Sequence, residues 1–137
     1  MTSAANFSNG SNLTQKLTKL SLIGYNSLVM EREIKKLELQ NGHVTFDDWF
    51  NSLRTQKMQV GVDARLARGR AGNFGDCKSV GGGVFELRIA QGPGLRIYYG
   101  LHGRQVVILL GGGDKSTQTR DIQRAQKLWL QFKKDAP

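Results

Sequence analysis

Two arginines on neighbouring predicted strands are the residues of this chain best suited to chemistry. Apolar, β-branched runs over 84–90 and 95–101 flank a short turn with two glycines and a proline, which is typical of a hairpin. Symmetric closure places Arg88 opposite Arg96 and Glu86 opposite Tyr98, with Ile89–Leu95 and Leu87–Ile97 as apolar pairs. Because like charges directly opposite each other cost stability, this pair indicates an anionic ligand such as phosphate.

The polar face of this hairpin has the groups that phosphodiester cleavage needs. Two guanidiniums can hold a phosphate and stabilise the extra charge of a pentacoordinate transition state. Glu86 or Tyr98 beside them can move a proton. With Lys78 and Lys115 at the strand ends, the set is sufficient for metal-free RNA cleavage by a ribose 2′-OH. A plain structural role fits equally well, in which Glu86 neutralises Arg88 and Tyr98 packs.

Charge raises the question of a partner before any motif does. The chain has 137 residues, enough for one domain, and a formal net charge of +9. From Arg54 to Lys134 bases outnumber acids by fifteen to five. Such an excess favours nucleic acid or a strongly acidic protein as partner, and it also fits unspecific binding to polyanions.

Several other functions are disfavoured. The run 111–116 is rich in glycine and includes Lys115, but Asp114 stands where a Walker motif needs glycine. His43 and His102 lie in predicted turns without companions at metal-ligand spacing, so no metal site is expected. The single Cys77 excludes a disulfide within the chain, and neither a secretory pattern nor a membrane-length apolar run is present. We expect a cytoplasmic protein.

The remaining patterns predict an α+β fold built on an antiparallel sheet. Residues 1–30 are rich in Ser, Thr, Asn and Gly and are expected to be a flexible extension, with a short helical pattern of leucines, before a domain over 31–137. A strand is expected over 34–39, and a meander of three strands over 84–90, 95–101 and 105–110. Residues 111–113 should end the sheet, and 69–83 should form a glycine-rich loop.

Three helices complete the prediction. Thr45 should cap the first helix, which has acids in its first turn, and a second should run over 55–67 and end at Gly69. A final helix is expected after a cap at Ser116, Thr117 or Thr119. On the second helix four cations share one stripe, a pattern typical of a solvated face: Arg54, Lys57, Arg65 and Arg68.

Several motifs in consistent order resemble the RelE/ParE superfamily of toxins from type II toxin–antitoxin pairs. The similarity is greatest to its HigB-like branch, the addiction-module killer proteins, and covers about residues 34–132. The motifs that carry it are FDDWFNSL (46–53), GNFGDCK (72–78), ELRI (86–89), GPGLRIYY (92–99), GGDKSTQ (112–118) and RDI (120–122).

The resemblance implies a microbial RNase-type fold with a four-stranded antiparallel sheet, two N-terminal helices and one C-terminal helix. RelE- and HigB-type members cut mRNA in the ribosomal A site, whereas ParE-type members inhibit DNA gyrase without cutting RNA. Both kinds are neutralised by a cognate antitoxin. The resemblance therefore implies a ribosome-dependent mRNA endonuclease without a cofactor, or alternatively a gyrase inhibitor.

Site roles transfer by position. The arginine that stabilises the family's transition state matches Arg96, its basic residue after the last strand matches Lys115, and its Glu-Leu-Arg arginine matches Arg88. Leu95 replaces the usual tyrosine, and the paired strand lysines of RelE correspond to Val84 and Glu86. The general base is therefore left to Glu86 or Tyr98.

The resemblance also implies partners. These are mRNA, the ribosome and an antitoxin that is acidic or of helix-turn-helix type, in a hetero-oligomeric complex. The cations expected to contact RNA are Arg88, Lys78, Arg65 and Arg68, since positive charge favours both the rRNA backbone and an acidic partner.

Overall fold

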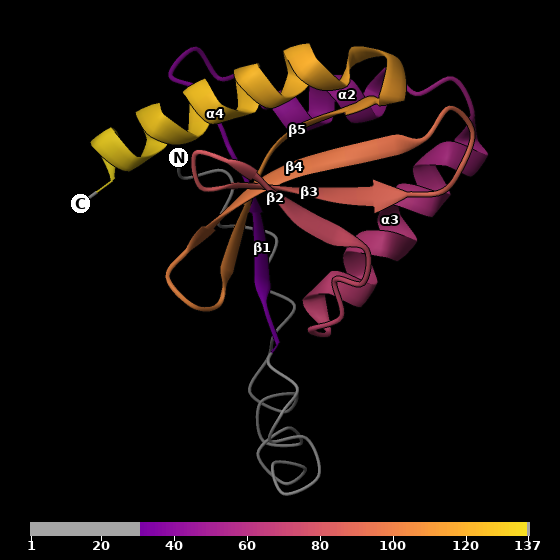
Figure 1. Cartoon of the computed structure of the whole chain (residues 1–137), viewed down its shortest axis with the longest axis horizontal. Helices are drawn as coiled ribbons and strands as arrows, with labels where there is room; N and C mark the ends of the chain where they lie inside the picture. The colour runs from indigo at the N-terminus through magenta and orange to yellow at the C-terminus, as the bar shows by residue number, and fades with distance from the viewer. Residues whose placement is uncertain (1–30, 137) are drawn as a thin grey trace, which may run out of the picture.

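The computed structural model describes residues 31–136, so the extension expected over residues 1–30 lies outside the described residues. The described part is an α+β fold with a five-stranded sheet in the order β1-β5-β4-β3-β2 (Figure 1). Its strands are β1 (Glu33–Lys36), β2 (Cys77–Gly81), β3 (Val84–Ile89), β4 (Leu95–His102) and β5 (Val106–Asp114). Its helices are α2 (Thr45–Asn51), α3 (Gln56–Arg70) and α4 (Gln118–Asp135), with a 3-10 turn, η2 (Lys115–Thr117), before α4.

The central hairpin has the predicted register. β3 and β4 are antiparallel, with Arg88 opposite Arg96 and Glu86 opposite Tyr98. The apolar pairs Leu87–Ile97 and Ile89–Leu95 are also confirmed. The five-residue turn and the alternating apolar pattern were therefore sufficient to fix which side chains share a face.

The sheet differs from the expected one in the number and direction of its strands. It has five strands, because the region predicted as a glycine-rich loop contains β2, antiparallel to β3. β2 is mostly exposed and therefore lacks the alternating burial by which sequence reveals a strand. The sheet is mixed, because β1 pairs with β5 in parallel. The expectation of a four-stranded antiparallel sheet was therefore wrong on both points.

The glycines 111–113 do not end the sheet. β5 continues through them to Asp114. Large side chains from the helices fill the space above two of these glycines. A Cβ on Gly112 would lie 2.3 Å from the Trp49 ring, and one on Gly113 would lie 1.9 Å from Asp121 Oδ2. Gly112 and Gly113 are thus required by close packing rather than by a turn, whereas a Cβ on Gly111 would meet nothing within 4 Å.

The helices begin and end slightly away from the predicted residues. Thr45 is the first residue of α2, not its cap, and its hydroxyl donates a hydrogen bond of 2.6 Å to the carbonyl of Leu110. Thr55 caps α3 by accepting from the backbone N–H of Met58. α3 passes through Gly69 to Arg70, and the Phe74 ring packs where a side chain on Gly69 would lie.

Two hydrophobic cores lie on opposite faces of the sheet. One includes Leu87, Ile97 and Tyr99 and packs against α2 and α3 through residues such as Phe46 and Leu66. The other includes Val84 and Tyr98 and packs against α4 through Ala125, Trp129 and Phe132. Residues of the Arg88–Arg96 face therefore share their side of the sheet with α4, which crosses the top of Figure 1.

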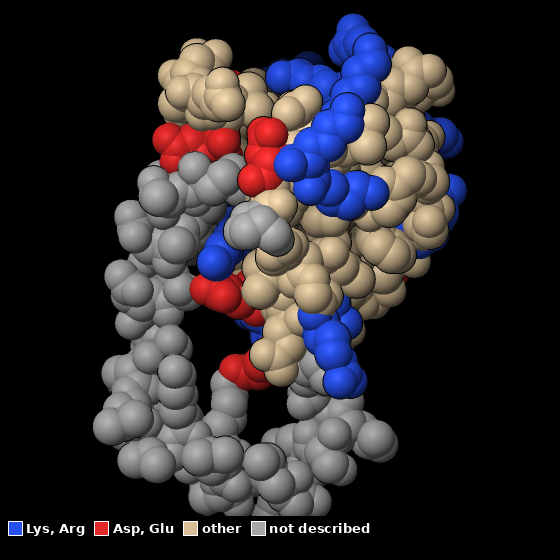
Figure 2. Space-filling model, turned by 90° about the vertical axis from the view of Figure 1, so that its left-hand side faces the viewer, with Lys and Arg blue, Asp and Glu red and all other residues tan. Residues whose placement is uncertain are grey.

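Charge on the surface is uneven. Figure 2 shows Lys and Arg side chains gathered across the upper right of one face, level with α4, with acidic side chains beside them at the upper left and others lower on that face. Within residues 31–136 no helix is long and apolar enough to cross a membrane.

The packing of Trp129 on Gly100 yields a stability prediction. A Cβ at Gly100 would lie 2.6 Å from the Trp129 ring, so Gly100→Ala should lower the free energy of unfolding by about 1–3 kcal/mol through overpacking. Urea denaturation measures this change.

Gly61→Ala is the matched control. Its Cβ would meet only the flexible end of the Gln91 side chain, and alanine favours a helix interior over glycine by about 1 kcal/mol. We expect Gly61→Ala to be neutral or stabilising. Equal loss in both variants would show that Trp129 does not pack closely on β4.

Candidate anion-binding site

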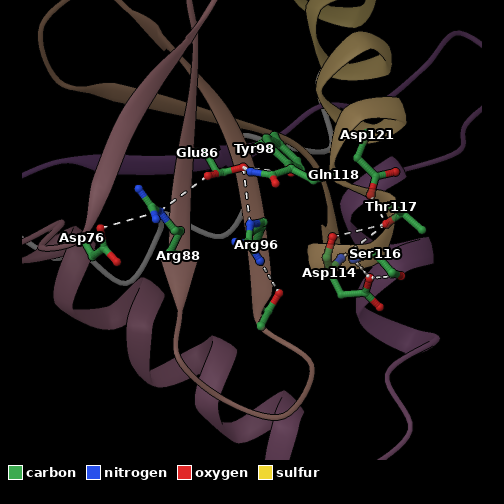
Figure 3. Close-up of polar contacts among 11 residues, drawn as sticks. Asp76, Glu86, Arg88, Arg96, Tyr98, Asp114, Ser116, Thr117, Gln118 and Asp121 are labelled. Atoms are coloured by element: carbon green, nitrogen blue, oxygen red, sulfur yellow. Dashed lines mark hydrogen bonds and ion pairs between the residues drawn. The ribbon is translucent and has the colours of Figure 1, made fainter.

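The candidate site lies on the α4 face of the sheet, just beyond the first turn of that helix. β3 contributes Glu86 and Arg88, and β4 contributes Arg96 and Tyr98 opposite them. Gln118, the first residue of α4, reaches the same cluster. Figure 3 shows these side chains converging around the Glu86 carboxylate.

Glu86 is fully buried, with 0% of its surface exposed. Its Oε2 accepts hydrogen bonds from Tyr98 Oη at 3.1 Å and from Gln118 Nε2 at 2.8 Å. A buried carboxylate is costly unless it is paired and hydrogen-bonded. These two donors and the nearby guanidiniums supply that compensation.

The two arginines lie on either side of this carboxylate. Arg96 Nε is 3.6 Å from Glu86 Oε2, and Arg88 Nε is 3.6 Å from Glu86 Oε1. These separations are ion pairs but are longer than hydrogen bonds, and Glu86 Oε1 and both Nε atoms are buried without a hydrogen-bond partner. Together with Lys78, which lies opposite Glu86 on β2, the two arginines make three cations against two acids, Glu86 and Asp76, so this face of the sheet carries a net positive charge.

The arginines differ in how far they reach solvent. The side chain of Arg88 is 38% exposed, and its Nε lies 3.8 Å from Asp76 Oδ1 at the edge of the sheet. The side chain of Arg96 is 10% exposed, and its Nη1 donates a 2.8 Å hydrogen bond to the carbonyl of Gly94. Arg96 is therefore held rigidly, whereas Arg88 has a freer, outward-facing edge.

Tyr98 does not have the properties of a proton acceptor. It is 1% exposed, and burial, with a further contribution from the Glu86 charge, raises the pKa of its phenol well above the ordinary value. Its hydroxyl already donates to Glu86. Both side chains predicted to transfer a proton, Glu86 and Tyr98, are thus buried and bonded to each other, because the sheet and α4 enclose them.

Lys115 extends the site at the end of β5. Asp114 lies opposite Leu95 in the sheet, and Lys115 follows it as an exposed residue of η2. The Asp114 carboxylate accepts from the Ser116 backbone N–H at 2.8 Å and also from the Ser116 hydroxyl. The hydroxyl hydrogen bond lowers the pKa of Asp114. Asp114 therefore fixes the turn that presents Lys115.

The other predicted RNA-binding cations lie in different places. Lys78 on β2 lies opposite Glu86 on β3 and is exposed, so it belongs to the same face of the sheet.

Arg65 and Arg68 are on α3, across the sheet. Arg65 is buried and donates to the carbonyls of Asn73 and Phe74; burial lowers its pKa. The expectation of a solvated stripe is therefore wrong for Arg65, whose hydrogen bonds hold the loop after α3. Arg68 is exposed, as expected.

Two contributors to the site were not among the predicted residues. Gln118 holds Glu86, and Asp76 lies beside Arg88. Both occur in the sequence motifs at 72–78 and 112–118. The only sequence feature that could have indicated Gln118 is its position as an amide side chain at the start of the helix that follows β5. Among the described residues, no group of three or more His, Cys, Asp or Glu side chains could hold a metal ion.

This geometry defines a class of protein: a small α+β domain with a positively charged arginine cluster on one face of its sheet. A family model described as "Phage derived protein Gp49-like (DUF891)" matches residues 48–129, which include the whole cluster. The chain belongs to this Gp49-like family, which is associated with toxin–antitoxin modules and related to addiction-module killer proteins.

A curated relative supports this assignment. An uncharacterized protein of Haemophilus influenzae is 48% identical over 85 residues, which make up 62% of this chain and 86% of the relative. The aligned part therefore includes most of that shorter protein. The finer assignment to the HigB-like branch rests on the motifs alone.

The buried carboxylate yields a prediction about stability. Glu86→Gln removes the negative charge that Arg88 and Arg96 share. The guanidinium of Arg96 is mostly buried. Removing one partner of a buried ion pair costs about 3–5 kcal/mol, and we expect a loss of this order by urea denaturation. Asp76→Asn is the control: Asp76 is largely exposed, so it should cost no more than about 1 kcal/mol. A mild effect of Glu86→Gln would contradict the central role of this charge.

Tyr98 yields a prediction about pH. Its pKa in the folded protein lies above the unfolded value of 10.0. The neutral phenol therefore contributes fully below pH 10, and stability is lost as pH rises from there towards the folded pKa. Tyr98→Phe should weaken the decline in unfolding free energy above pH 10, measured by urea titration from pH 8 to 11. Tyr99, which has a similarly raised pKa, remains in both proteins, and equal slopes would contradict the prediction.

Proposed function

We propose that this protein is the toxin of a type II toxin–antitoxin module and acts as a ribosome-dependent mRNA endonuclease that inhibits translation. The observation that carries the proposal is the pair of arginines, Arg88 and Arg96, held side by side with net positive charge on one face of the sheet. Membership of a family associated with toxin–antitoxin modules supports it.

The proposed reaction is attack of a ribose 2′-OH on the adjacent phosphate. The 2′ oxygen forms a bond to phosphorus and its proton passes to solvent water. The bond from phosphorus to the 5′ oxygen breaks, and that oxygen takes up a proton from solvent, so a 2′,3′-cyclic phosphate and a 5′-OH result. Negative charge builds on the phosphate oxygens in the transition state. Arg96, held by Gly94 and Glu86, stabilises that charge, and Arg88 with Lys115 holds the phosphate.

Glu86 and Tyr98 are assigned a different role in this proposal from the one predicted. Glu86 and Tyr98 are 0% and 1% exposed, against 10% for the side chain of Arg96, so in this proposal they position the guanidiniums instead of moving a proton. mRNA held on the ribosome would supply the alignment of the 2′-OH with its phosphate, an effect that can account for a large part of a rate enhancement. The reaction as proposed uses no metal or organic cofactor.

The same burial favours a second candidate, a ParE-like inhibitor of DNA gyrase that does not cut RNA. In that function the arginine cluster would bind an acidic surface or a DNA backbone, and no proton acceptor is needed. Under either candidate the proposed partner is a cognate antitoxin of acidic or helix-turn-helix type, in a hetero-oligomer in the cytoplasm.

Induction in growing cells, followed by mapping of mRNA 5′ ends within minutes, separates the two candidates. Codon-aligned cleavage is expected for the endonuclease, whereas a DNA-damage response with intact mRNA would support gyrase inhibition. In a purified translation system Arg96→Ala should reduce cleavage by about 10²–10³-fold, the usual cost of removing one donor from a transition-state site.

Two further variants make this test specific. Arg96→Lys keeps the positive charge but loses the planar guanidinium fork, so its mRNA cleavage should remain strongly impaired. Urea denaturation of the same variant checks that it is folded. Arg104→Ala removes an exposed arginine between β4 and β5 and should leave cleavage unchanged. A folded Arg96→Ala protein that still cuts mRNA would overturn the assignment of Arg96.

A further inference from the structure

The outer face of α4 carries a row of cations that none of the roles above uses. Arg120, Arg124, Lys127 and Lys134 follow helical spacing on the side opposite the buried residues Ala125, Trp129 and Phe132. All four are exposed. We call these four residues the α4 ribbon.

The α4 ribbon has no acidic partner within residues 31–136. None of its four cations forms an ion pair with a described carboxylate. The two acids of α4 are bonded to other side chains: Asp121 to Thr117, and Asp135, at the end of the helix, to Gln131 at 3.1 Å. A row of like charges costs helix stability, so its presence without neutralisation indicates an external polyanion.

The ribbon is continuous with the arginine cluster. Lys115 lies next to Arg96, because both approach Gly94, and Lys115 and Arg120 line the same surface hollow of about 390 Å³. From Arg120 the ribbon extends about 21 Å along the helix, at 1.5 Å per residue. A chain with one phosphate at Arg88 and Arg96 could therefore continue along α4.

The composition of this face favours a nucleic acid over an acidic protein. Its other exposed side chains are mainly glutamines, Gln123 and Gln131, which donate hydrogen bonds, and the only large exposed hydrophobic residue there is Leu130. Protein interfaces are depleted of charge at their core and rely on apolar or aromatic anchors. Phosphate contacts need only repeated cations and polar donors.

We propose that the α4 ribbon is an RNA-docking surface that binds the phosphate backbone without reading its sequence. This assignment takes RNA as the partner from the proposed function, but it does not require cleavage. It also moves the docking surface from α3, where Arg65 is buried, to α4. The ribbon would hold RNA or rRNA while the arginine cluster engages a single phosphate.

Salt-dependent binding of a labelled 20-nucleotide RNA hairpin, followed by fluorescence anisotropy without ribosomes, tests the proposal. Each phosphate contact contributes about 0.7–0.9 to the slope of log K against log salt concentration. The variant Arg120→Gln, Arg124→Gln, Lys127→Gln should therefore reduce the slope by about two to three. At 0.15 M salt it should bind about a hundredfold more weakly.

The matched control removes the same charge elsewhere. Lys57→Gln, Arg70→Gln, Arg104→Gln changes three exposed cations outside α4 and should alter the affinity less than about fivefold. Equal losses in the two variants would overturn the proposal in favour of unspecific attraction by net charge. Unchanged binding by the α4 variant would also overturn it.

Two further measurements complete the test. The single variant Lys127→Gln, which keeps a good helix former, should reduce the slope by just under one, so the prediction does not depend on the triple variant folding. Poly-L-glutamate of matched charge serves as an acidic-protein probe: if it binds the ribbon more tightly than RNA does, the partner is a protein and the assignment fails.

Failure of this proposal can be distinguished from failure of the proposed function, because the binding experiment uses free RNA. If the protein binds free RNA but cuts no mRNA on ribosomes, the endonuclease is refuted and the docking surface stands.

Discussion

The candidate site depends on one interaction, the placement of a single buried carboxylate between two arginines. Hairpin register forces Arg88 and Arg96 to face each other, and in a low-dielectric setting their repulsion would splay the strands. Each oxygen of Glu86 forms an ion pair with one guanidinium, and Oε2 also accepts hydrogen bonds from Tyr98 and Gln118. The carboxylate thus holds the two cations together while leaving surplus positive charge at the surface.

This arrangement links the site to the helix that covers the neighbouring part of the sheet. Gln118 is the first residue of α4, and the rest of that helix is anchored by Trp129 against Gly100. The position of the Glu86 carboxylate is therefore set both by β3 and by the docking of α4. The candidate site thus combines a mostly buried arginine, Arg96, with a more exposed one, Arg88.

The sequence was sufficient for those parts of the fold that follow from local pattern. The register of β3 with β4, the acids at the start of α2 and the final helix all come from turn chemistry and periodicity over a few residues. The parallel pairing of β1 with β5 could not be predicted, because it joins segments more than seventy residues apart. The exposed strand β2 was missed for lack of alternation, and the role of Gly112 and Gly113 depended on Trp49 and Asp121 in three dimensions.

For the candidate site, the sequence predicted which side chains lie opposite each other but not how deeply they are buried. Residue type and spacing placed Glu86, Arg88, Arg96 and Tyr98 on one face, but they gave no information on depth. Burial is a property of the assembled layers, and the burial of Glu86 and Tyr98 between the sheet and α4 has no signature in the local sequence. The same limit applies to Arg65, whose hydrogen bonds to the loop after α3 have no signature in a helical charge pattern.

The pairing of β1 with β5 also has a consequence for biosynthesis. β1 is the first described strand to emerge from the ribosome, yet its only strand partner among the described residues, β5, extends to Asp114. Until most of the chain has been translated, Ile34 has no neighbouring strand, and the sheet cannot close at that edge. The sheet of a nascent chain therefore stays open at this edge until β5 has emerged, so folding of the described domain is completed late in translation.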